Sequence, residues 1–418
     1  MNRSGGLRAL LVGLVVAVVV VVALPAPPAS AHAALVETVP AAETAVDEAP
    51  DAIVLRFNEA VSTSLGGVKV FAAGGDDVDV GKPTTSGDGT TVTASLPALD
   101  DGAYAVSWRV VSADAHPIKG AFTFVVGDGA GGAAAKADLA ERLSESVGGA
   151  TRMVGVAFGA ARLAVFAGLV VLVGGIAFLW LLWPAGLGAL GCRRLLGGAW
   201  LAAFTATIAG IALQGAYASA GTLADAFKPS LFADVLSTRF GTVWALRAGL
   251  LLLALAFVIP LGRERARAPS GPLRLGGALL GGALLLTPGL SGHASTGQWR
   301  IASLVSDVTH LGAVALWLGG LTVLAAVLLP RRDARTTTEV VPRFSRLAFA
   351  AVVIIVVTGT FQSWRQVRFA DALTDTTFGR LLLVKVAVFV GLVGVAAFSR
   401  RLLHARLRIP SPARPRLA

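Results

Sequence analysis

Seven long apolar runs from residue 156 onward constrain the fold of this chain more than any other feature. Crossing the hydrocarbon core of a bilayer takes roughly 20 residues of helix, and each run is about that long or longer. The runs occupy residues 156–183, 196–218, 241–261, 273–291, 303–329, 345–364 and 380–399. Charged residues make up only 15% of the 418-residue chain, whereas soluble domains carry about 25%. We therefore expect an all-α polytopic membrane domain over residues 155–403.

Basic residues in the connecting loops predict how the helices are oriented. Cytoplasmic loops of membrane proteins carry an excess of Lys and Arg. The loops after the first, third and fifth runs, together with the C-terminal end, hold 17 arginines, against six basic residues on the other side. We expect a cell-membrane protein with its N-terminal domain outside and its basic tail, 404–418, in the cytoplasm. The net charge of +11 lies mostly in these loops, which argues against a nucleic-acid partner.

The first 31 residues have the pattern of an export signal. Two arginines precede an apolar run, 9–24, and Ala29-Ser30-Ala31 forms an A-x-A cleavage site. Removal of residues 1–31 would make His32 the first residue of the mature chain. Cleavage two residues later is also compatible with the pattern and would remove that histidine. An uncleaved anchor is the third alternative, but the run is short for a spanning helix.

Residues 32–127 have the pattern of a small all-β domain. Short runs rich in β-forming residues alternate with clusters of Gly, Asp and Pro, as in a sandwich of two sheets. Five basic and thirteen acidic side chains give this segment a net charge of −8. Residues 128–154 are rich in Gly and Ala and read as a flexible linker.

Three residues of the β domain form a candidate metal site. Cleavage before His32 frees an α-amine beside an imidazole, and these two groups can chelate one metal ion. Asp114 and His116 lie two residues apart, so their side chains project to the same side of an extended segment. Three nitrogens and one oxygen suit Cu(II). The alternative is a solvated turn. The single cysteine, Cys192, rules out a Cys-based zinc site.

Polar residues in the membrane domain form a second candidate site. Both His293 and His310 fall at the outer side in the expected orientation, and Asp307 shares a helix face with His310. Ionisable groups inside a span cost about 2.5–3.5 kcal/mol, so they usually face a partner or a cavity. We predict a metal relay fed from outside. The alternatives are an exposed loop histidine for His293 and a helix–helix hydrogen bond for His310. Arg247 is expected to pair with Asp307 or to extend toward the interface. Three further polar side chains near the outer ends could contribute: Gln214, Tyr217 and Gln362.

Three segments of the β domain resemble the CopC family of periplasmic copper-binding proteins: His32-Ala-Ala-Leu, Leu55-Arg-Phe-Asn-Glu-Ala-Val and Val111-Ser-Ala-Asp-Ala-His-Pro-Ile-Lys-Gly. The resemblance implies an Ig-like, cupredoxin-like Greek-key sandwich that holds Cu(II) through His32, Asp114 and His116. It also places Glu59 near an acidic residue that supports the ligands. Some members have a methionine-rich Cu(I) site, which we do not expect because residues 32–127 contain no methionine.

The membrane half resembles the CopD family, to which CopC domains are often fused. Four segments carry this resemblance: Ser291-Gly-His-Ala, Thr309-His-Leu-Gly-Ala-Val-Ala-Leu-Trp-Leu-Gly-Gly-Leu, Arg343-Phe-Ser-Arg and Phe378-Gly-Arg-Leu-Leu-Leu-Val-Lys. The family is usually drawn with eight spans, whereas seven runs are counted here. An interfacial helix near 223–236 would account for the difference, and so would a missing span.

These features predict copper capture outside the cell and delivery to the membrane domain for import, without enzymatic activity. Copper, the bilayer and other copper-handling proteins are the expected partners. The chain has no P-loop, so transport would not be driven by ATP on this chain. Copper resistance by sequestration without net transport is the main alternative. An N-terminal-histidine copper monooxygenase and a membrane-tethered adhesion sandwich are minor ones.

Overall fold

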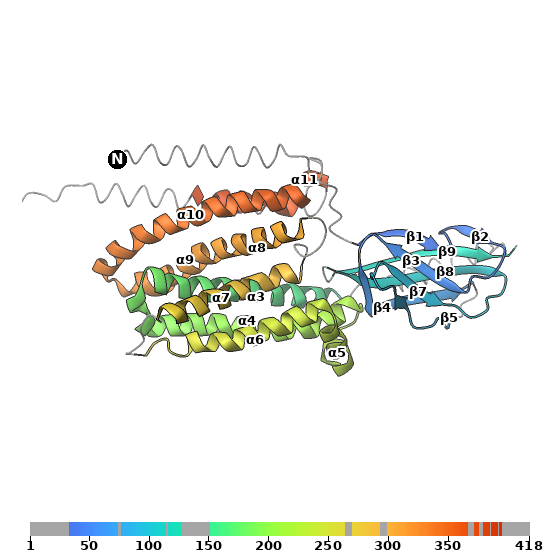
Figure 1. Ribbon diagram of the computed structural model, residues 1–418, viewed down its shortest axis with the longest axis horizontal. Coiled ribbons are helices and arrows are strands. Elements are labelled where there is room, and N and C mark those ends of the chain that lie inside the picture. Colours follow the sequence, from blue (N-terminus) through green and yellow to red (C-terminus); the bar gives the residue numbers. More distant parts are fainter. Residues whose placement is uncertain are drawn as a thin grey trace, which may run out of the picture.

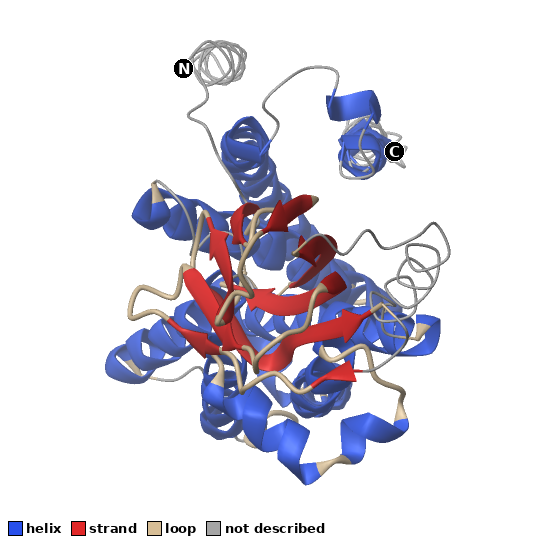
Figure 2. Ribbon diagram, turned by 90° about the vertical axis from the view of Figure 1, so that its right-hand side faces the viewer, coloured by secondary structure: helices blue, strands red, loops and turns tan. Residues whose placement is uncertain are grey.

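A computed structural model of the chain shows a β-sandwich at one end of a helical bundle (Figure 1). The structure describes residues 33–73, 77–113, 116–127, 151–263, 270–292, 299–366, 372–375, 379–384, 386–391 and 393–394. In the view along the bundle axis, the strands of the sandwich lie in front of the helix ends (Figure 2). The predicted order, an all-β domain followed by an all-α domain, is confirmed.

Two sheets form the sandwich, one of four strands in the order β1-β3-β7-β6 and one of five in the order β2-β9-β8-β4-β5. Their bounds are β1 Leu35–Val39, β2 Thr44–Val46, β3 Ala52–Phe57, β4 Val61–Ala72, β5 Asp77–Val78, β6 Thr84–Thr85, β7 Thr91–Ser95, β8 Gly102–Ser112 and β9 Pro117–Val126. Alternate residues of β3 (Ile53, Leu55 and Phe57) are buried, as the period of a strand requires. Phe57 also meets Trp108 of β8 edge-on, with 5.4 Å between ring centroids, and so links the two sheets.

The bundle contains six helical segments that are long and apolar enough to cross a membrane within the described part of the chain. They are α3 Arg152–Leu181, α4 Leu190–Ala218, α6 Arg239–Val258, α7 Gly271–Leu290, the segment Arg300–Arg331 and α10 Ala334–Gln366. These match six of the seven predicted runs. The seventh is described only over 379–384, 386–391 and 393–394, where it is helical, so its span stays a prediction.

Shorter helices interrupt or connect these segments. The fifth segment begins with α8 Arg300–Val314 and continues through two π-helical stretches, η4 Ala315–Gly319 and η5 Leu324–Leu328, on either side of α9 Gly320–Val323. Between α4 and α6 lie η2 Ala224–Phe227 and α5 Pro229–Ser237, in the stretch near 223–236 where an interfacial helix was one of the two alternatives. The others are η1 Pro184–Gly188, η6 Leu329–Arg331 and α11 Ala372–Asp375.

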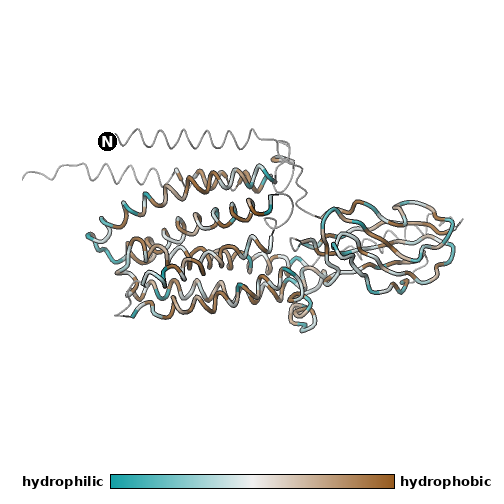
Figure 3. Tube along the Cα trace, in the orientation of Figure 1, coloured by the Kyte–Doolittle hydropathy of each residue, from teal (hydrophilic) through white to brown (hydrophobic). Residues whose placement is uncertain are grey.

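Glycines let α3 cross the fifth segment at backbone contact. A Cβ at Gly174 would overlap the carbonyl oxygen of Ala315, and one at Gly319 would overlap that of Val170. Small residues at such crossings are typical of membrane helices, whose association depends on close van der Waals packing. Apolar residues run along the helices, whereas hydrophilic ones gather at the loops farthest from the sandwich (Figure 3).

The sandwich sits on the end of the bundle where α3, α6 and α8 begin and where α4, α7 and α10 end (Figure 1). Strand β4 contacts α4 and α5 there. Leu65 of β4 is 3% exposed and Val111 of β8 is 5% exposed, and both belong to the buried apolar cluster of the bundle. The two domains therefore share part of their core.

Candidate functional site

The start of the described chain is fixed to the sandwich by two hydrogen bonds with Asn58, one to its side chain and one from its backbone. The Ala34 N–H donates to Oδ1 of Asn58 (2.7 Å), and the Asn58 N–H donates to the Ala34 carbonyl (3.1 Å). Ala33 is buried in the sandwich core. The predicted ligand His32 directly precedes Ala33 in sequence and lies outside the described residues.

The turn that carries the other predicted ligands joins β8 to β9. The backbone N–H and the hydroxyl of Ser112 both donate to the His116 carbonyl, at 3.0 and 3.1 Å. These bonds bring the end of β8 and the residue before β9 together, and Asp114, between them in sequence, lies outside the described residues. His116 is described, is half-buried and directly precedes β9.

A four-residue segment connects these two places. Asn58, at its start, holds Ala34, and Val61, at its end, pairs with Ser112 across β4 and β8. Three residue steps span at most about 10 Å, so the chain start and the turn lie at the same end of the sandwich. Glu59 lies within this segment and has a buried Oε1. The ligand set of His32, Asp114 and His116, and the supporting role of Glu59, stay predictions.

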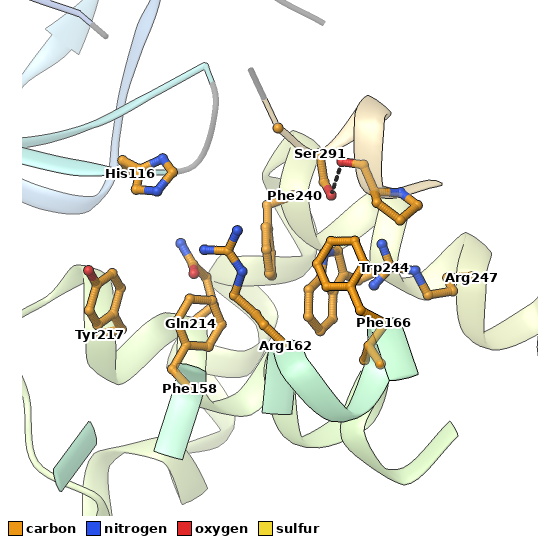
Figure 4. Close-up of a pocket in the computed structure, with 13 residues that line it drawn as sticks. His116, Phe158, Arg162, Phe166, Gln214, Tyr217, Phe240, Trp244, Arg247 and Ser291 are labelled. Carbon is orange, nitrogen blue, oxygen red and sulfur yellow. Dashed lines mark hydrogen bonds between the residues drawn. The ribbon is translucent and has the colours of Figure 1, made fainter. Parts of the chain in front are cut away.

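His116 also lines a pocket of about 50 Å³ between the sandwich and the bundle (Figure 4). Every other residue of the lining belongs to the membrane domain. They are Phe158, Arg162, Val165 and Phe166 of α3, Gln214 and Tyr217 of α4, Phe240, Trp244 and Arg247 of α6, and Pro288, Ser291 and Gly292 at the end of α7. His293 follows Gly292 in sequence and lies outside the described residues.

A bulge in β4 explains why the sandwich docks in this position. The pairing of β4 with β8 shifts register between Ser62 and Gly67, and a bulge of this kind redirects the side chains within it. Leu65 lies in the bulge and packs into the bundle cluster. The next residue must be glycine, because a Cβ at Gly66 would overlap the carbonyl oxygen of Arg109.

Arg247 is placed differently from the sequence-based expectation. Its side chain is almost fully buried, its Nε donates to Oγ1 of Thr287 on α7 (2.7 Å), and its guanidinium lies 4.4 Å from the ring centroid of Trp244. It therefore neither pairs with Asp307 nor extends outward. The reason is the order of the helices. Helix α7 stands between Arg247 on α6 and Asp307 on α8, and Asp307 lies against Gly289 of α7.

His310, the predicted relay histidine on α8, faces α10. Nδ1 of His310 lies 2.8 Å from Oγ1 of Thr358, which is the helix–helix hydrogen bond of the alternative interpretation. One turn earlier, Ser306 accepts from Nε2 of Gln362 at 3.5 Å. Within the described part of the chain, no three His, Cys, Asp or Glu residues come together to hold a metal. Because His293 lies outside that part, the relay through His293, Asp307 and His310 stays a prediction.

Sequence analysis identified Gln214 and Tyr217 as residues near the outer ends but missed the aromatic and cationic part of the pocket. The sequence did contain a helical pattern that points to this part of the pocket. Phe158, Arg162 and Phe166 follow one another at intervals of four residues on α3, which places them on one face of the helix. What the sequence did not show is that the sandwich covers this face at the end of the bundle.

Three family profiles match the chain. The CopC domain covers residues 35–127, the N-terminal domain of the Copper resistance protein D-like family covers residues 153–301, and Copper resistance protein D covers residues 338–418. Together they follow the division seen in the structure, with a sandwich followed by a helical bundle.

Individual relatives agree with these matches. Copper transport protein CutJ of Bacillus subtilis is 28% identical over 376 residues, which are 88% of this chain and 67% of that protein. Copper resistance protein C of Pseudomonas syringae pv. tomato is 36% identical over 133 residues, 30% of this chain and 98% of that protein. The crystal structure of CopC from Methylosinus trichosporium OB3b is 28% identical, covers 23% of this chain and 93% of that one, and gives a TM-score of 0.22. The chain thus belongs to the CopC–CopD family of copper resistance and transport proteins, with both domains joined in one multi-pass membrane protein.

Proposed function

We propose that the sandwich captures Cu(II) outside the cell and passes it through the pocket beneath it to the membrane domain for import. The observation that carries this proposal is the position of His116. It is a predicted copper ligand at the edge of the sandwich, and it lines a pocket whose remaining walls are membrane helices. A copper ion released from His116 on that side would enter the membrane domain without crossing bulk solvent.

The proposed ligands suit capture of a divalent ion. The amine and imidazole of His32 and the imidazole of His116 would supply three nitrogens, and Asp114 would supply one carboxylate oxygen, a set that favours Cu(II). The net charge of −8 on residues 32–127 raises the local concentration of cations. Gln214, Tyr217 and Ser291 then offer oxygen and nitrogen atoms along the pocket.

The same position of His116 weighs against the monooxygenase alternative. Such an enzyme needs an open coordination position beside a flat surface for its substrate, whereas here the membrane helices lie in front of His116 (Figure 4). Resistance by sequestration is the second candidate function, and the name of the relative from Pseudomonas syringae pv. tomato, Copper resistance protein C, favours it.

Cell copper content separates the two candidates. Import predicts that deletion of the gene lowers cell copper and slows growth under copper starvation, and that His116→Ala reproduces the defect. His404→Ala, the same substitution in the cytoplasmic tail, is the matched control and should behave as the wild type. Unchanged cell copper, combined with greater sensitivity to excess copper, would contradict import and support sequestration.

A further inference from the structure

The pocket between the sandwich and the bundle has the charge of an anion site. Two guanidinium groups line it, those of Arg162 and Arg247, and no Asp or Glu is among its lining residues. Figure 4 shows both side chains at this one pocket, so two positive charges share it. A pocket that served only a copper cation would not be expected to contain this pair.

Arg247 is buried without enough partners. Arg247 is 1% exposed, and its Nε donates a hydrogen bond to Thr287. Its buried Nη1 has no hydrogen-bond partner among the described residues. Nε1 of Trp244, which lines the same pocket, is likewise buried without a partner in the described part of the chain. Both atoms are donors. Buried donors are normally satisfied, and a buried charge is costly unless it is paired.

The depth of Arg247 adds to this cost. It follows Arg239, the first residue of α6, by eight residues, which is about 12 Å along the helix axis. At this depth a charged side chain usually marks a binding site or a pathway. Thr287 and the ring of Trp244 contribute a neutral oxygen and a π-face, but neither supplies a negative charge.

We propose that this pocket binds a small oxyanion, of the carboxylate or phosphate class, between Arg247 and Arg162. A guanidinium presents parallel N–H donors that match two oxygens of such an ion. Nη1 of Arg247 and Nε1 of Trp244 supply the donors, and the rings of Phe158 and Phe240 limit access of water. The inference goes beyond copper delivery and does not depend on it. If copper does pass from His116, the bound anion offsets the two positive charges in its path.

Calorimetric titration of the purified full-length protein in detergent tests the proposal, with sodium acetate, phosphate and chloride as separate probes. We expect saturable one-to-one binding of acetate or phosphate in the absence of copper. Arg162→Gln should weaken that binding at least tenfold. Arg247→Lys should do the same, because it retains a charge but loses the planar guanidinium with its parallel N–H donors. Arg152→Gln is the matched control, because Arg152 is an exposed arginine on the same helix as Arg162 and lies outside the pocket lining.

Each outcome decides the proposal. Arg162 is exposed, so Arg162→Gln should fold even if Arg247→Lys does not. In that case the affinity of Arg162→Gln alone tests the proposal. A phosphate response that is present in lipid-free micelles and absent in phosphatidylglycerol nanodiscs would identify a lipid headgroup as the source of the oxyanion. Binding of chloride alone, absence of saturable binding by the wild type, or equal affinity of Arg162→Gln and the wild type would overturn the proposal.

Discussion

His116 of the sandwich and Arg247 of α6 line the same pocket, although one belongs to the domain that matches CopC and the other lies within a membrane helix. The relationship depends on the bulge in β4, which brings Leu65 into the apolar cluster of the bundle. A copper-binding domain tethered only by its linker would not keep its ligand in one position above the helices. Docking makes the edge of the sandwich one wall of a pocket whose other lining residues belong to the membrane domain.

Truncation of Leu65 should loosen this docking. Removal of a buried leucine side chain typically costs about 2–5 kcal/mol, and here part of the lost contact is with the bundle. Leu65→Ala should therefore increase hydrogen–deuterium exchange in β4 and at the helix ends that face the sandwich, and should lower copper uptake. Val36→Ala is the control, because Val36 lies in the same sandwich and is 69% exposed. Equal exchange in both variants would show that Leu65 does not hold the domains together.

Gly174 should not tolerate a side chain. A Cβ there overlaps the carbonyl oxygen of Ala315, so Gly174→Ala must separate α3 from the fifth segment and should lower the melting temperature in detergent. Gly155, on the same helix, has open space around its would-be Cβ. Gly155→Ala should be neutral or stabilise the protein by up to about 1 kcal/mol, because alanine favours helix. A Gly174→Ala variant as stable as the wild type would contradict the close crossing.

Thr358→Val tests whether His310 has a role beyond helix packing. The substitution removes the hydroxyl that lies 2.8 Å from Nδ1 of His310, and side-chain hydrogen bonds between membrane helices average about 0.6 kcal/mol. We expect a stability loss of about that size with copper uptake retained, and a loss of uptake in His310→Ala. Thr360→Val is the control, because that hydroxyl bonds only within its own helix. Normal uptake by a well-expressed His310→Ala would remove His310 from the proposed relay.

The loop between α4 and α5 should weaken in strong acid. Hydrogen bonds from the Lys228 side chain and from Thr222 lower the pKa of Asp225 from 3.8 to about 2. A carboxylate with a lowered pKa stabilises the fold fully above its unfolded value, and this contribution is lost as the pH falls through about 2. The difference in melting temperature between the wild type and Asp225→Asn should therefore be constant above about pH 5, shrink as the pH falls toward 2 and vanish below about pH 2. A difference that persists unchanged at pH 2 would contradict this assignment.

Local patterns were sufficient to predict much of the fold. The alternation of Ile53, Leu55 and Phe57 marks a strand with one buried face, and uninterrupted apolar runs mark the spans, because each pattern depends only on residues that are neighbours in the sequence.

The pocket could not be predicted in this way, because it depends on contacts between distant segments. Arg247 meets Thr287, forty residues further along the chain, and His116 reaches the bundle only because the β4 bulge sets the docking. An arginine inside an apolar run was expected to find a carboxylate or to extend toward the interface. Which helix stands beside it is a tertiary property, and α7 separates it from Asp307.

Titration of Cu(II) into the purified full-length protein, after intact-mass confirmation of its first residue, tests the central claim most directly. The account predicts one tight site when the chain begins at His32. His116→Ala, or one extra residue before His32, should weaken it by more than the roughly 10–100-fold expected for residues that only support a ligand, such as Glu59. Equal affinity of the wild type, His116→Ala and the extended chain would contradict the account.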